Sequence, residues 1–117
     1  MILAALFVST FAQSSPQPDP LTFDLRCMIA ASNLRESTDA TARASGTAAA
    51  LFYFGRIDAR LTEAELERRL AAEAAIIPTE NRSQLMRDCG AFMSARGQAL
   101  IRIGQRISAR ERGAATQ

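Results

Sequence analysis

The spacing of apolar residues along this 117-residue chain is that of helices, and no run alternates as a strand would. Four segments carry the pattern, at about residues 22–36, 40–60, 62–77 and 81–110. A chain of this length makes one domain with a modest core. The pattern therefore predicts an all-α, four-helix bundle-like single domain.

Local signals set the ends of these helices. Residues 37–39 offer an N-cap for the second helix, although Gly46 leaves open a start just after it. The third helix opens with a capping box made by Thr62 and Glu65 and ends before Pro78. These signals place the helices one after another with short connections.

The fourth segment carries the least usual pattern of the chain, in which large residues alternate with glycine at heptad spacing. Its members, called the Met/Gly stripe below, are Met86, Gly90, Met93, Gly97, Leu100, Gly104 and Ile107. Three interior glycines cost a helix about 3 kcal/mol relative to alanine, so we expect another helix to approach closely and seat bulky residues over them. The alternative is that Gly97 breaks the segment into two shorter helices.

The first residues have the composition of an export signal. Residues 1–12 are an uncharged apolar run that closes on a small residue and is too short to cross a bilayer, and residues 13–20 are a Pro-rich spacer. We expect a signal peptide and a spacer here, a helical domain at 21–112 and a disordered tail at 113–117. The alternative for the first run is a helix that packs on the rest of the chain. Export predicts a periplasmic or secreted protein with no stable membrane anchor after cleavage.

The chain has two cysteines, Cys27 and Cys89. In an oxidising compartment they have one intramolecular pairing available, so export predicts a disulfide between them. Closing a loop of about 60 residues would stabilise the fold by about 4 kcal/mol. The alternative is a pair of buried free thiols in a cytosolic protein.

Charge is small overall and uneven along the chain. The formal net charge of +2 is too low to indicate a nucleic-acid partner. Glutamates gather in residues 62–80, where the helix dipole favours them, whereas residues 82–112 carry seven arginines. Arg102, Arg106 and Arg110 form a row one turn apart, which either keeps that face hydrated or makes a weak contact with an anionic group such as a lipid head group.

The residues that enzymes commonly use are scarce. The chain has no histidine, and cysteines held in a disulfide supply no thiolate nucleophile. The two cysteines do not form a C-x-x-C pair, and the glycines fall within a helix pattern and not in a phosphate-binding loop. We expect no enzymatic activity, no metal and no cofactor.

Three consecutive aromatic residues lie in the second helix, where they cannot all face one way. Phe54 and Ile57 look like core residues, so Tyr53 would present its ring and hydroxyl elsewhere. The possible partner patch consists of Tyr53, Arg56, Asp58 and Arg60, with Asp58 in reach of a local ion pair. The alternative is a central core helix whose edges are hydrated.

The order of these features resembles that of the small periplasmic acid-stress chaperones of bacteria. The resemblance rests on Arg26, Cys27 and Met28, on a central helix at residues 48–54, and on Asp88, Cys89 and Gly90. It implies a dimer that is folded at neutral pH, loosens when carboxylates protonate and holds unfolding clients through exposed apolar surface.

A fainter resemblance is to periplasmic immunity proteins, which inhibit secreted toxins. It rests on Tyr53, Gly55 and Asp58. Both resemblances imply a helical protein that acts by binding another protein. We therefore expect an exported, non-enzymatic protein-binding module, chaperone-like or inhibitor-like, whose partner is another protein or a second copy. The alternative is a self-associating structural or envelope-associated protein.

Overall fold

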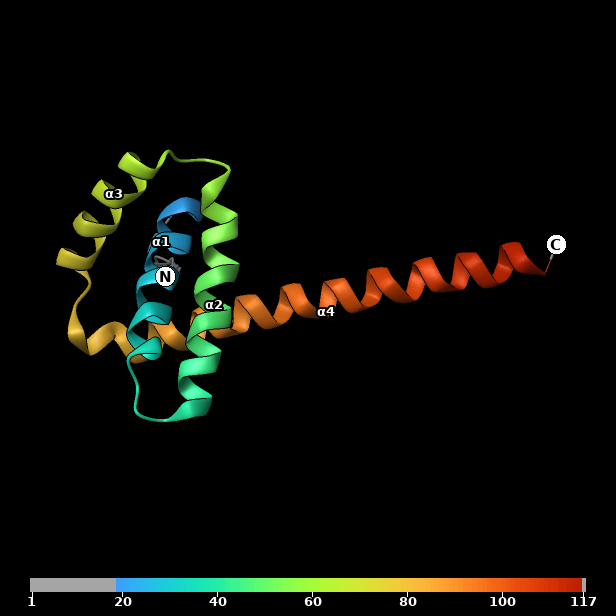
Figure 1. The fold of residues 1–117 in the computed structure, drawn as a ribbon, viewed down its shortest axis with the longest axis horizontal. Coiled ribbons are helices and arrows are strands. Elements are labelled where there is room, and N and C mark those ends of the chain that lie inside the picture. The colour runs from blue at the N-terminus through green and yellow to red at the C-terminus, as the bar shows by residue number, and fades with distance from the viewer. Residues whose placement is uncertain (1–18, 117) are drawn as a thin grey trace, which may run out of the picture.

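The computed structural model describes residues 19–116, which form four α-helices and one short 3₁₀ helix (Figure 1). The elements are α1 (Pro20–Arg35), α2 (Ala40–Asp58), α3 (Glu63–Ile76), η1 (Thr79–Asn81) and α4 (Arg82–Ala115). No strand occurs in this part of the chain, so the prediction of an all-α protein with four helices is confirmed. The predicted signal peptide at 1–12 and most of the spacer lie outside the described residues.

The start of α1 uses the last two residues of the predicted spacer. The Asp19 carboxylate accepts hydrogen bonds from the backbone N–H of Thr22 at 3.0 Å and from its hydroxyl at 2.6 Å. These two bonds, the hydroxyl bond first, hold the pKa of Asp19 below its usual value. Pro20 occupies the first helical position, where its missing N–H costs no hydrogen bond. The helical domain therefore begins slightly earlier than the sequence pattern predicted.

The helix α2 also begins earlier than its glycine suggested. The Asp39 carboxylate caps it by accepting a hydrogen bond from the backbone N–H of Ala42 at 3.1 Å, and the helix starts at the residue after Asp39. Gly46 is buried at a close approach of α1 and α2. A Cβ at this position would lie 2.8 Å from the backbone oxygen of Ala31 and from the Cβ of Leu34. Gly46 is required for helix packing and does not mark a helix boundary.

The helix α3 forms an outer layer of the molecule. Its N-terminus is capped as predicted, with the Thr62 hydroxyl accepting a hydrogen bond from the backbone N–H of Glu65 at 3.3 Å. None of its own residues is buried. It packs on α1, whose Arg26 donates a hydrogen bond to Glu73 at 2.9 Å. Since α1 is its main neighbour and none of its residues is buried, α3 is the peripheral helix of the body.

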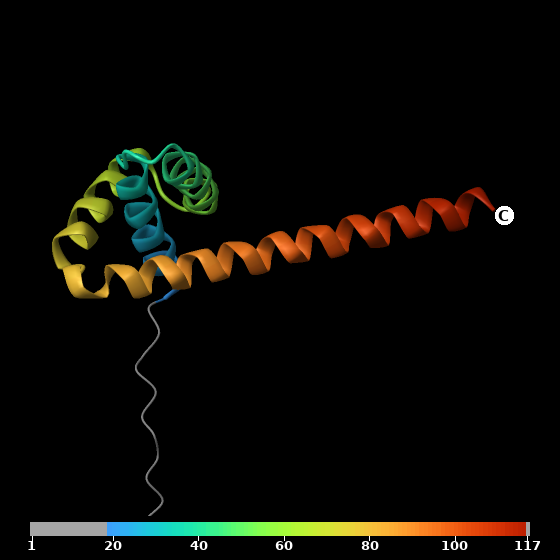
Figure 2. The ribbon, with the colours of Figure 1, turned by 90° about the horizontal axis from the view of Figure 1, so that it is seen from below.

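The core is built around α1, which packs against α2, α3 and α4 (Figures 1 and 2). The side chains less than a tenth exposed are Asp24, Leu25, Cys27, Ala30, Ala31, Tyr53, Ile57 and Cys89. Most of them come from α1 and α2, so this helix pair carries the hydrophobic core. Five partly buried side chains pack against the cluster that the disulfide forms with Tyr53: Phe23, Met28, Phe52, Leu85 and Phe92.

The helix α4 is one continuous helix of 34 residues, about 51 Å long at 1.5 Å per residue. The alternative in which Gly97 divides it is therefore wrong, and the helix runs through Ala115 in place of the disordered tail predicted from residue 113. Its start packs on α1, and the rest projects away from the other helices (Figures 1 and 2). Residues 19–93 are called the body below, and residues 94–115 the arm. The body is bundle-like, and the arm leaves the bundle.

Candidate protein-interaction surface

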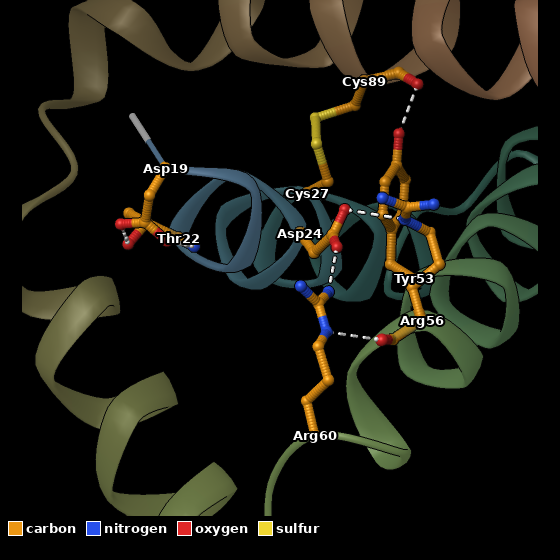
Figure 3. Close-up of polar contacts among 8 residues, drawn as sticks. All are labelled: Asp19, Thr22, Asp24, Cys27, Tyr53, Arg56, Arg60 and Cys89. Carbon is orange, nitrogen blue, oxygen red and sulfur yellow. Dashed lines mark hydrogen bonds and ion pairs between the residues drawn. A yellow bond between two sulfur atoms is a disulfide. The ribbon is translucent and has the colours of Figure 1, made fainter. Parts of the chain in front are cut away.

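A disulfide between Cys27 and Cys89 fixes the start of α4 to α1, as the sequence predicted (Figure 3). The two Cα atoms are 5.5 Å apart. Beside it, the Tyr53 hydroxyl donates a hydrogen bond to the carbonyl oxygen of Cys89 at 2.5 Å. The disulfide therefore holds the first part of α4 on α1, and the buried hydrogen bond holds it on α2.

A buried ion-pair cluster lies next to the disulfide. The Asp24 carboxylate is fully buried and accepts a hydrogen bond from Arg56 Nε at 2.9 Å and a second one from the guanidinium of Arg60 (Figure 3). Arg60 Nε also donates to the backbone oxygen of Arg56 at 3.0 Å, and the Arg56 guanidinium lies 4.7 Å from the centre of the Phe92 ring. The cluster ties α2 to α1 and, through Phe92, to α4.

Asp24 is the residue that sequence reasoning missed. Arg56 and Arg60 were expected to pair locally with Asp58, but their partner is Asp24 on the neighbouring helix, and Asp58 is exposed. The available signal was an acid placed between two apolar residues of α1, a position that needs a cationic partner when it is buried. Nothing in the linear sequence states which arginine that partner is.

The four residues of the possible partner patch do not form one exposed surface. The prediction that Tyr53 points away from the core is wrong: its side chain is 1 % exposed, while Phe54, predicted to be core, is 40 % exposed. The Tyr53 ring makes edge contacts with the rings of Phe23 and Phe52. Burial, and secondarily the charge of Asp24, raise the pKa of Tyr53 to about 12. Tyr53 is therefore a structural residue that helps to position α4.

The Met/Gly stripe lies along α4 and crosses from the body into the arm. Its arm residues are in solvent, with Leu100 70 % and Ile107 49 % exposed. Apart from its chain neighbours and the adjacent backbone of α4 itself, a Cβ placed at Gly90, Gly97 or Gly104 would meet no described atom within 4 Å. The expectation that a helix packs over these glycines is therefore not met within residues 19–116 of one chain.

Two further apolar residues widen the exposed face of the arm. Ile101 is 54 % exposed and Ile103 is 42 % exposed. Arg102 and Arg106 lie two residues before and after Gly104. At about 100° per residue, each is therefore rotated about 200° from Gly104 and projects from the side of the helix opposite the stripe. The arm is therefore amphipathic, with an apolar face that no other described residue covers.

The stripe also continues into an apolar pocket of the body. This pocket has a volume of about 160 Å³ and opens between α1, α2 and α4. Residues of all three helices line it, among them Cys27, Ala31, Ala49, Met86, Gly90 and Met93. A wider groove of about 380 Å³ between α1, α3 and the start of α4 lies beside it, and Met86 lines both. The exposed face of the arm and the pocket together form one apolar surface along α4.

Two kinds of site are not found in the described part of the chain. Among residues 19–116, no three His, Cys, Asp or Glu side chains are grouped so that they could hold a metal ion. Over the same residues, none of the helices has an apolar stretch long enough to span a membrane. The surface with the clearest potential for binding is the apolar face of α4.

Comparisons of this chain with protein-family models, with curated proteins and with solved structures gave no match. The fold and the surface define the class of the protein, which is small and all-helical. Its two distinguishing features are the disulfide near the start of α4 and the arm with its apolar face that follows.

Proposed function

We propose that the chain is an exported, non-enzymatic protein-binding module that binds its partner through the arm. The observation that carries this proposal is the exposure of four large apolar side chains on one projecting helix: Leu100, Ile101, Ile103 and Ile107. Soluble proteins rarely leave contiguous apolar surface in water unless it binds something. Helix faces with anchors at this spacing are a common means of binding another protein.

The chemistry of the body supports a binding role over a catalytic one. The chain has no histidine, and both cysteines are joined in the disulfide. The buried acid, Asp24, is engaged by two arginines and so is not free to act as a base. The disulfide itself supports export, because such bonds persist mainly in oxidising compartments.

The proposal is tested by capture of partners from an envelope extract. The immobilised bait is the disulfide-bonded chain, used as wild type, as Leu100→Glu and as Ala109→Glu. Both changes add one acid to an exposed position of the arm, but Ala109 lies away from the stripe. We expect one dominant protein with wild type and with Ala109→Glu, and at least a tenfold lower recovery with Leu100→Glu. Equal recovery by all three baits, or an eluate without a dominant protein, contradicts the proposal.

The chaperone-like form of this function has its own test. At about pH 3, the protein should suppress light scattering by an acid-unfolding client, and the Leu100→Glu variant should suppress it less. A client that aggregates equally with and without the protein excludes this form and leaves the inhibitor-like form.

A further inference from the structure

We infer that the partner of the arm is a second copy of this chain, whose arm lies antiparallel on the Met/Gly stripe and reaches the apolar pocket of the body. This inference rests on the proposed function of the arm as a binding surface. It names the partner and the geometry of the contact.

The order of large residues and glycines is self-complementary when two stripes run in opposite directions. In one register, Gly97 faces Leu100 of the second copy, Met93 faces its Gly104, and Gly90 faces its Ile107. Each layer from Gly90 to Ile107 then pairs one large residue with one glycine, and Met86 faces Glu111 of the second copy at each end. In a parallel pair, glycine would face glycine and large residues would face each other, which leaves gaps in alternate layers. Close packing therefore favours the antiparallel arrangement.

The pocket lies where this register needs it. Ile107 of the second copy comes to Gly90, and Gly90 lines the pocket of about 160 Å³ between α1, α2 and α4. That volume is about five times the share of one water in the liquid, enough for a four-carbon side chain. Ile107 is 49 % exposed in the single chain, so its burial in an apolar pocket is favourable. Because the pair is symmetric, Ile107 of each copy enters the pocket of the other, once at each end of the contact.

The distribution of charge favours the same direction. The arm carries five arginines and one glutamate: Arg96, Arg102, Arg106, Arg110, Arg112 and Glu111. The first part of α4 with η1 carries two arginines and two acids: Arg82, Arg87, Glu80 and Asp88. A parallel pair would bring the basic ends of two arms together, whereas the antiparallel register places residues 104–115 of each arm beside residues 82–93, which carry less positive charge. Arg102 and Arg106 point away from the stripe in either case.

The size of the contact indicates a dimer of moderate affinity. The paired segments, residues 86–111, extend over about 39 Å at 1.5 Å per residue. A strip of that length and about one helix diameter wide on each copy, with both pockets, buries on the order of 1,000 Å², at the lower limit of specific interfaces. We therefore expect dissociation in the micromolar range.

The oligomeric state of the disulfide-bonded chain tests the inference by sedimentation equilibrium from about 1 to 200 μM. We expect a monomer–dimer equilibrium for wild type and for Ala109→Glu. Leu100→Glu and Gly97→Leu should be monomeric over the whole range. Since neither position contacts the body, both variants should keep the helix content of wild type and unfold no earlier than the dilute wild-type monomer, which separates loss of the dimer from loss of the fold.

The direction of the pair is read from one spin label at Arg112→Cys. In the antiparallel register, residue 112 lies opposite residue 85 of the second copy, so the two labels are separated by about 40 Å along the axis. A parallel pair places them within about 20 Å. A long distance that disappears in Leu100→Glu supports the inference, and a short one overturns the antiparallel register.

The failure of this inference and that of the proposed function give different results. A monomeric wild-type chain at 200 μM overturns the inference. If capture then still recovers a dominant protein in a Leu100-dependent way, the arm binds a different protein and the proposed function stands. If neither association nor capture depends on Leu100, both proposals fall.

Discussion

The body and the arm each use a glycine in the middle of a helix, for opposite reasons. In the body, Gly46 is buried between α1 and α2, where a Cβ would lie 2.8 Å from three atoms of α1. In the arm, a Cβ at Gly97 would have no described atom within 4 Å apart from its chain neighbours and the adjacent backbone of α4 itself. The contact that explains Gly46 is present among the described residues, whereas these residues provide no such contact at Gly97.

Pairs of arginines repeat the contrast. Arg56 and Arg60 are one turn apart in the body, and both bind the buried carboxylate of Asp24. Arg102 and Arg106 have the same spacing in the arm and are exposed. The same sequence spacing thus serves core stability in one region and hydration of a polar face in the other. What differs is the presence of a neighbouring helix.

The largest expected effect comes from breaking the disulfide that holds the start of α4 on α1, from which the arm extends. The double variant Cys27→Ala/Cys89→Ala should lower the free energy of unfolding by about 4 kcal/mol, because the unfolded chain regains the freedom of a loop of about 60 residues. Urea denaturation measures the change. Wild type in excess dithiothreitol is the matched control and should unfold at nearly the same urea concentration as the variant. A variant as stable as oxidised wild type would show that packing alone holds α4 on the body.

The next largest effect concerns the buried cluster of the body. Arg56→Met/Arg60→Met should lower the free energy of unfolding by about 3 kcal/mol, because it leaves the Asp24 carboxylate buried without a cation. Asp24→Asn should cost less, about 1 to 2 kcal/mol, since both arginines can reach water. Asp58→Asn, at an exposed site on the same helix, is the control and should change stability by less than about 0.5 kcal/mol. Equal losses for the double arginine variant and the control would contradict this role of Asp24.

High pH should lower the free energy of unfolding of the body, because it favours the loss of the Tyr53 hydroxyl proton. Its pKa is raised to about 12, against 10.0 for a free tyrosine, so the folded state holds the hydroxyl proton more tightly. The stability from this difference is complete below pH 10 and is lost as the pH rises from 10 to 12, by about 3 kcal/mol. The chain has no lysine and its cysteines are paired, so the signal belongs to its single tyrosine. Tyrosinate absorbance and urea midpoints measured together should move in parallel, and Tyr53→Phe should be insensitive to pH in this window.

The smallest effects compare the two glycines directly. Gly46→Ala should lower the free energy of unfolding by about 2 kcal/mol, because the added methyl group overlaps the backbone of α1. Gly97→Ala should raise helix stability by about 1 kcal/mol, because the site is open and alanine favours a helix. Circular dichroism during thermal unfolding of the dilute monomer measures both. A loss of stability in Gly97→Ala would show that α4 packs on the chain in a way that the structure does not contain.

Local features of this fold could be predicted from its sequence. The number of helices, the cap at Thr62 and the end of α3 before Pro78 depend on residues that are close together in the chain. The pairing of Cys27 with Cys89 followed from there being two cysteines. Each of these required short-range chemistry or simple counting, and each is confirmed.

The tertiary structure decided everything that depends on how one helix is rotated against another. Periodicity could not tell that Tyr53 points inward and Phe54 outward, because a helix with three successive aromatic residues can bury more than one face. It could not give Asp24 its partners on α2, nor show that Gly46 marks a close approach. The sequence by itself determined the Met/Gly stripe, since its heptad spacing is local. Only the tertiary structure revealed that three residues of the stripe line a pocket and the other four lie in water, because that depends on where α4 leaves the body.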